Sequence, residues 1–418
     1  MTVTSDTPDV EVPTSFRYFE NRDSVAGKAL ARALSKYVTG PLAYPDGVVT
    51  ELGRDRARSD PLSDAFMEAA FTGKYARDAR KMVDQALDHG IGSVPNASPE
   101  LVALFEQLDT EPDWLDWDRV ERGAKVFRRY GVDAFYYFGL ITIDGYRNEF
   151  IHKPLILTGA YTGGSAFGRF LETCRFWIDV SEPGGLRHGG EGRKTAVTVR
   201  IMHSMIRRRI APHPEWDGPR LGVPLSQNAQ LGTLFTSFLL NQHTKKLGYL
   251  VTDDEILDHM HFWRYVGYIL GVEPSRYPET VDDWWRMAYT TMLQDTKHDG
   301  PDAKMLAQSF VSAFGPTDED SAEVRSRKTK EYHKVRNWGR FFLSAKSFTV
   351  NDLPDPGWRR WLPLLHVGPN LVNDIGRRIV PGYADVIDRR QRARRLAWLE
   401  SHMAGQPPRF TPVEVLSR

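Results

Sequence analysis

His203 is the residue whose surroundings most directly suggest chemistry in this chain. It lies in the stretch RKTAVTVRIMHSMIRRRI, from Arg193 to Ile210. Steps of three, four and seven residues from it reach the apolar side chains Ala196, Val199, Ile206 and Ile210. On a helix these residues share one face, so we expect the imidazole of His203 to point inward from an apolar stripe.

Arginines flank this histidine on the same expected helix. Arg200 and Arg207 lie one turn before and one turn after it, and Arg208 and Arg209 extend the positive charge. A neutral imidazole facing an apolar cavity, with guanidinium groups at its edge, suits an iron ligand of haem whose propionates bind the arginines. From periodicity alone a packed core histidine remains the more common explanation, because a single histidine is not a motif.

A second polar group lies on the expected helix AFGRFLETCRFWIDV, residues 166–180. Arg169 and Thr173 share a face with the apolar Phe176 and Val180, and Glu172 lies beside them. Charged groups are costly to bury unless they serve one another or a ligand, which makes these three residues site candidates. The alternative is an exposed Arg169–Glu172 pair, worth roughly a few tenths of a kcal/mol.

Other patterns are weaker. His259 and His261 are two residues apart and point in different directions on a helix, so we do not expect them to share a metal ion. Cys174 is the single cysteine, which excludes intramolecular disulfides and cysteine-based metal clusters. The basic segment 388–402 is either a contact for membrane or RNA or a solvated helix face. Phosphate-loop, dinucleotide, serine-hydrolase and HExxH zinc motifs are absent from the sequence.

The elements that would position these residues are helices. Apolar residues recur at spacings of three and four, and alternating strand-like runs are scarce, which predicts an all-α fold. We expect one large helical domain over residues 16–403, with flexible tails at 1–15 and 404–418. The net charge of +1 gives no overall attraction to nucleic acid. No apolar run reaches the roughly 18 residues of a spanning helix, and the first residues do not form an export signal, which predicts a cytoplasmic protein.

Five segments, taken in order, resemble the rubber oxygenase (latex clearing protein) family, which also includes the MpaB-type oxygenases. Together they cover roughly residues 100 to 275. The segments are Trp117–Gly131, Leu157–Val180, Ala196–Ile210, Gly222–Phe238 and His261–Val272. The resemblance implies a globin-like helical core around haem b and oxidative cleavage of carbon–carbon double bonds by molecular oxygen.

The resemblance also implies roles for single residues. His203 takes the place of the proximal iron ligand, Arg169 and Thr173 match the distal arginine and threonine, and Thr233 matches a further threonine near the haem. The chain departs from the rubber-cleaving members at Glu172, where they have a lysine that can reach the iron. For the family's catalytic glutamate, Glu149 is the nearest match, so Glu172 and Glu149 are both candidates for the base.

The resemblance therefore predicts a haem b-dependent oxygenase, with O2 and an apolar unsaturated small molecule as partners and an unidentified reductant as a further one. An isoprenoid or terpenoid-like alkene is expected rather than polymeric rubber, because the chain shows no export signal. Three alternatives stay open: a haem- or oxygen-binding sensor or carrier without catalysis, a helical interaction protein without a cofactor, and a haem-dependent dehydratase or other rearrangement without net oxygenation. Fold alone does not decide between them.

Overall fold

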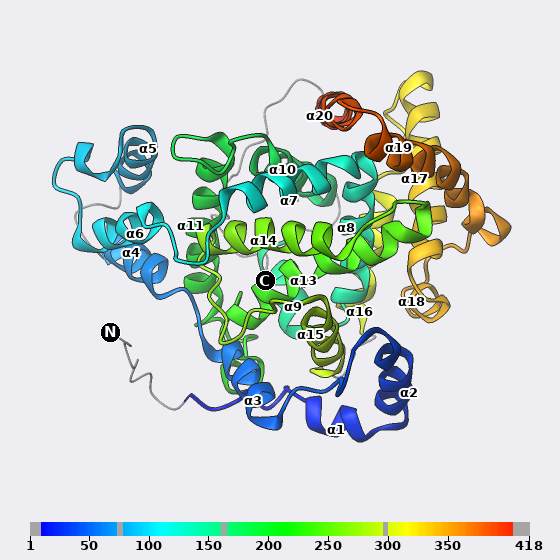
Figure 1. Ribbon diagram of the computed structural model, residues 1–418. Helices are drawn as coiled ribbons and strands as arrows, with labels where there is room; N and C mark the ends of the chain where they lie inside the picture. The colour runs from blue at the N-terminus through cyan, green and yellow to red at the C-terminus, as the bar shows by residue number, and fades with distance from the viewer. Residues whose placement is uncertain (1–9, 73–77, 160–164, 296–299, 404–418) are drawn as a thin grey trace.

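The structure is a computed structural model that describes residues 10–72, 78–159, 165–295 and 300–403. Across these ranges the regular secondary structure is helical, and no strand occurs in them. The all-α prediction is therefore confirmed. Figure 1 shows the helices gathered around a central group that contains α7, α13 and α14.

The helices follow one another in three groups along the chain. The first group is α1 (Tyr18–Asp23), α2 (Val25–Leu34), η1 (Ser35–Tyr37), α3 (Asp46–Arg54), η2 (Asp55–Ala57), α4 (Pro61–Thr72), α5 (Ala79–His89), η3 (Ile91–Ser93) and α6 (Pro99–Asp109). The second is α7 (Trp117–Arg129), α8 (Val132–Gly145), α9 (Glu149–Thr158), α10 (Ser165–Ser181), α11 (Glu191–Ile210), α12 (Gly218–Leu221), α13 (Gln227–Thr244), η4 (Lys245–Leu247), α14 (Asp253–Ile269) and α15 (Val281–Leu293). The third is α16 (Pro301–Ser312), α17 (Ala322–Phe342), α18 (Ala345–Val350), η5 (Gly357–His366), α19 (Val367–Ile379) and α20 (Tyr383–Met403).

Helix α14 packs closely along α7, and a glycine makes this approach possible. A Cβ atom at Gly123 of α7 would lie 2.0 Å from the carbonyl oxygen of Asp258 on α14. At the same crossing, Asp258 accepts hydrogen bonds from Arg119 at 3.0 Å and Arg122 at 2.6 Å. The start of α14 is set by Thr252, whose side chain forms a capping box with Glu255.

Helices α10 and α11, which carry the predicted site residues, are joined closely at one end. Gly192 lies so near α10 that a Cβ atom there would be 2.4 Å from the carbonyl oxygen of Asp179. Next to this contact the hydroxyl of Thr195 donates to Asp179 at 3.1 Å, and the amide of Arg193 donates to the carbonyl of Gly185 at 2.8 Å. These contacts determine how the two helices leave their shared turn.

The largest apolar core takes residues from nearly the whole chain, from Phe16 to Leu399. It includes the aromatic run of α8, Phe135 to Phe138, whose side chains are at most 4% exposed. The basic segment 388–402 forms most of α20 and packs against α7 and α10. Its Arg395 is buried and binds Ser181 and Glu182, so this helix is held to the body and is not solvated all round.

In the described part of the chain, no helix combines the length and the apolar character needed to cross a bilayer.

Candidate functional site

His203 lies where the apolar stripe of α11 changes from one hydrophobic cluster to another. Ala196 and Val199 pack with the large core, whereas Ile206 and Ile210 belong to a separate small cluster. The small cluster consists of Phe150, Leu157, Ile210, Trp216, Leu221 and Ala229, with Ile151 and Ile206 packed against it. His203 itself is half-buried between the two groups. The predicted inward face therefore exists, and its apolar packing is interrupted at the histidine.

A glutamine on α13 holds the imidazole. Nδ1 of His203 lies 3.2 Å from Oε1 of Gln230, and the amide nitrogen of Gln230 donates to the carbonyl of Leu225 at 3.3 Å. Because the Leu225 carbonyl requires the NH2 end of the amide on its side, Oε1 faces the ring and accepts a hydrogen bond from Nδ1–H. Gln230 also lies between clusters, since Ala229 belongs to the small one and Leu231 to the large one.

The same contacts define the protonation state of His203. Burial lowers its pKa to about 4, and the nearby charge of Arg207 acts in the same direction. The imidazole is therefore neutral at physiological pH, with the proton on Nδ1 and the lone pair on Nε2. Among the described residues, Nε2 has no hydrogen-bond partner. A half-buried neutral histidine with a free lone pair is a competent ligand for a metal ion.

Backbone strain accompanies this arrangement. Leu225 has a φ of 53°, in the left-handed region that costs a bulky residue about 1–3 kcal/mol. Its carbonyl accepts from Gln230 and also from Nη2 of Arg207 at 3.2 Å. The strained loop before α13 is thus part of the support that fixes Gln230 behind the histidine.

Arg200 and Arg207, predicted to hold haem propionates, both have partners within the protein. Arg200 is 2% exposed and donates to both oxygens of Asp60, at 2.7 and 2.9 Å. Arg207 is 4% exposed and binds Asp64 together with the carbonyls of Pro224 and Leu225. A propionate would have to displace these buried acceptors, so the structure favours a role for both arginines in holding α11 to α4 and to the loop before α13.

The second predicted group, Arg169, Glu172 and Thr173 on α10, is joined by hydrogen bonds. Nη1 of Arg169 donates to Oε2 of Glu172 at 2.8 Å, and their side chains are 22% and 18% exposed. Thr173 donates its hydroxyl hydrogen to the carbonyl of Arg169 at 2.9 Å. The pair is therefore partly buried rather than fully solvated. Partial burial raises the pKa of Glu172, and the charge of Arg169 opposes that shift.

The α10 group and His203 are not bonded to each other. Within the ranges the structure describes, no hydrogen bond or ion pair joins His203 to Arg169 or Glu172, although α10 and α11 pack together. Thr233 lies one turn after Gln230 on α13, is exposed, and donates weakly to the carbonyl of Ala229 at 3.3 Å. The structure thus provides two polar positions on neighbouring helices, with the histidine at one and the carboxylate at the other.

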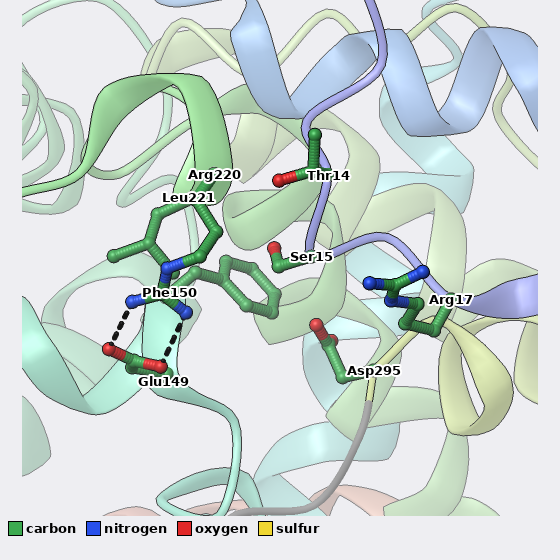
Figure 2. A pocket seen from close by; sticks show the side chains of 8 residues that line it. All are labelled: Thr14, Ser15, Arg17, Glu149, Phe150, Arg220, Leu221 and Asp295. Atoms are coloured by element: carbon green, nitrogen blue, oxygen red, sulfur yellow. Dashed lines mark hydrogen bonds and ion pairs between the residues drawn. The ribbon is translucent and has the colours of Figure 1, made fainter.

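Glu149 is in a different environment from Glu172. Both of its carboxylate oxygens accept hydrogen bonds from Arg220, at 2.7 and 2.8 Å. Figure 2 shows this pair at one side of a pocket, with Arg17 and Asp295 across from it. The pocket has a volume of about 230 Å³ and is lined by Thr14, Ser15, Arg17, Glu149, Phe150, Arg220, Leu221 and Asp295. Arg220 occupies both carboxylate oxygens of Glu149 and favours their ionised form. Glu172 has only one oxygen bound by an arginine, so it is the better-placed candidate for a base.

The remaining histidines singled out in the sequence have structural partners. His259 is buried, accepts from Trp263 at 2.8 Å and faces Asn241, while His261 accepts from the amide of Asp116 at 3.1 Å. In the described ranges no group of three or more metal-ligating side chains occurs.

Sequence reasoning missed Gln230, Asp60 and the strained Leu225. Gln230 lies 27 residues after the histidine that it binds, in a part of α13 that also carries Gln227, Asn228 and Thr233, so its local sequence does not single it out. Asp60 is 140 residues from Arg200, and nothing in its local sequence indicates the contact. These three residues contact α11 and hold its side chains in place, and none of them is a predicted reactive group.

Comparisons with known proteins identify the family of this chain. Residues 128–365 match the family model described as "ER-bound oxygenase mpaB/B'/Rubber oxygenase, catalytic domain", a range that contains all of the predicted site residues. A rubber oxygenase of Streptomyces sp. (strain K30) is 24% identical over 204 residues, which is 48% of this chain and 48% of that protein. The chain thus spans about half the length of this relative.

A solved structure gives an independent comparison of the fold. The structure of latex clearing protein LCP in the closed state is similar with a TM-score of 0.59 and 18% sequence identity. The similarity covers 82% of this chain and 91% of the other. The arrangement of helices is therefore shared well beyond the segments that are alike in sequence.

Proposed function

The chain belongs to the family of MpaB-type and rubber oxygenases, and from this premise we propose that it is a haem b-dependent oxygenase. The proposed reaction is oxidative cleavage of a carbon–carbon double bond by O2 in an apolar, isoprenoid or terpenoid-like small molecule in the cytoplasm. The observation that carries the proposal is His203, a neutral histidine with a free Nε2 lone pair at the boundary between two apolar clusters.

The residues present fit a haem. Nε2 of His203 would hold the iron, and Gln230 positions the ring through Nδ1–H. His203 and Gln230 lie where two apolar clusters meet, which gives the proposed ligand apolar surroundings on both sides. When bound, the haem supplies the redox chemistry that activates oxygen, and the protein supplies position and electric field.

The α10 group would act on the reactants. The guanidinium of Arg169 can donate hydrogen bonds to oxygen atoms on which negative charge develops. Thr173 and Thr233 would be further hydroxyl groups of the proposed site, each of which donates to a carbonyl of its own helix in the structure. Glu172 has one carboxylate oxygen bound to Arg169, while Oε1 has no partner among the described residues. We propose that Oε1 accepts a proton from an allylic carbon of the substrate.

A direct test combines a spectrum with a product assay. Protein produced with a haem supply should show a Soret band, consume O2 with an unsaturated terpenoid and form an aldehyde or ketone. Absence of a Soret band would reject the cofactor. A Soret band with oxygen binding but no carbonyl product would reject the oxygenase and favour a carrier or sensor.

Gln230→Ala is expected to weaken haem affinity by about 10–100-fold, because Nδ1 loses the acceptor that fixes the ring. The measurement is a haem titration of the apoprotein followed by absorbance. Gln230→Glu keeps an acceptor and should restore affinity, while a carboxylate makes the imidazole more basic and lowers the reduction potential of the iron. Equal affinity in the parent and the alanine variant would show that Gln230 does not position the ligand.

Glu172→Gln is expected to lower turnover by about 10²–10⁴-fold with haem still bound, since an amide cannot accept the proton. The parent should lose activity as pH falls through the pKa of Glu172, which burial raises above that of an exposed glutamate. The variant should lack this acidic limb. The matched control is Glu20→Gln, which removes the carboxylate of an exposed Arg17–Glu20 pair of the same spacing and distance. A full-activity Glu172→Gln enzyme with an unchanged pH profile would eliminate the base role.

A further inference from the structure

Large apolar side chains gather on the surface of η5 and α19. More than half of the exposed large apolar residues in the described ranges lie between positions 358 and 380. Trp358 is 71% exposed, Leu365 73% and Ile379 71%. We define the η5–α19 surface as Trp358, Arg359, Arg360, Trp361, Leu364, Leu365, Val372, Ile375, Arg378, Ile379 and Val380. Isolated exposed apolar residues are ordinary, but a cluster of this kind indicates an interaction site.

The apolar residues share faces of their helices. η5 is a 3₁₀ helix with three residues per turn, so Trp358, Trp361 and Leu364 lie in one row. On α19 the spacing of Val372, Ile375 and Ile379 puts them on one face as well.

The opposite sides of the two helices are already packed. Pro363 of η5 and Asp374 of α19 are buried, η5 packs against α17, and α19 packs against η5 and α20. Figure 1 shows α17, α18, α19 and α20 together at one edge of the molecule. The body therefore leaves the apolar rows to the solvent.

Basic groups lie among these apolar residues. Arg359 and Arg360 stand between the two tryptophans, and the Arg360 guanidinium lies 5.3 Å from the ring centre of Trp361. Nε of Arg360 has no hydrogen-bond partner among the described residues. The acidic residue of this segment, Asp374, is 1% exposed and binds Arg377 and the amide of Leu250. The η5–α19 surface is thus apolar and positive, without an exposed carboxylate.

We propose that the η5–α19 surface binds the surface of an anionic lipid bilayer. Tryptophan rings place an apolar body in the acyl boundary and a polar edge at the headgroups, and arginines pair with lipid phosphates. A second copy of the chain fits less well, because a two-fold contact brings the arginines of both copies together with no exposed carboxylate between them.

The test is co-sedimentation of the purified full chain with vesicles. The protein should bind vesicles of phosphatidylcholine with phosphatidylglycerol, bind pure phosphatidylcholine vesicles more weakly, and be released by salt. Trp358→Ser with Trp361→Ser should reduce partitioning about a hundredfold, since each fully buried ring contributes about a tenfold factor or more. The matched control is Val25→Ser, because Val25 is 89% exposed but lies outside the η5–α19 surface.

Charge variants make the test independent of the tryptophans. Arg359→Gln with Arg360→Gln should remove most of the preference for anionic vesicles, with an unchanged circular dichroism spectrum. The proposal is overturned if the parent binds neither vesicle type, or if folded variants bind as the parent does. It is also overturned if the chain is a dimer that the tryptophan variant converts to a monomer, with no vesicle binding. None of these outcomes depends on haem, so the proposed oxygenase is tested separately.

Discussion

Replacing His203 with alanine is expected to abolish the Soret band of protein produced with a haem supply, while the helical circular dichroism signal persists. The imidazole is the ligand that we propose for the iron, and its Nε2 lone pair has no other partner in the described part of the chain. His203 is half-buried at a break in apolar packing, so truncation leaves the two clusters on either side intact. Loss of the spectrum without loss of the fold distinguishes a ligand from a packed core histidine.

Two control experiments accompany the His203→Ala spectrum. His188→Ala removes an exposed histidine from the turn between α10 and α11 and should leave the spectrum unchanged. Imidazole added to His203→Ala should restore part of the band, because the space left by the side chain can admit a free ligand. Full haem occupancy with an unaltered spectrum in His203→Ala would show that another residue binds the iron.

Arg200→Ala is expected to lower the free energy of unfolding by about 3–5 kcal/mol, the usual cost of breaking a buried ion pair. Both side chains of the Arg200–Asp60 pair are 3% exposed, and the guanidinium binds both carboxylate oxygens. Without Arg200, the carboxylate of Asp60 remains buried and uncompensated. Urea denaturation of the apoprotein measures the change.

The double variant separates a structural role from a role in cofactor binding. Arg200→Met with Asp60→Leu removes both charges, so it should recover most of the stability that Arg200→Ala loses. If Arg200→Ala were as stable as the parent but bound haem more weakly, the arginine would be acting on the propionates after all. The structure predicts the opposite order of effects, because the guanidinium is already satisfied by Asp60 and Gln107.

Local patterns in the sequence were sufficient for the helical fold. Periodic apolar residues predicted the stripe on α11, and the helix indeed covers Glu191–Ile210. The i, i+3 spacing of Arg169 and Glu172 anticipated their contact, since neighbours at this spacing meet on any helix. The ordered segments also identified the family, which the family model confirms. The globin-like description, the single domain and the roles of the site residues remain predictions.

What the sequence determined by itself was therefore the class of fold, the family and the inward direction of His203, because these depend on short-range spacing and on ordered segments. Only the tertiary structure decided which groups meet these residues. Arg200 binds Asp60, Glu149 is held by Arg220, and Gln230 accepts a hydrogen bond from the histidine ring. Such contacts join helices far apart in the chain, and their geometry depends on how the helices pack rather than on the residues around each partner.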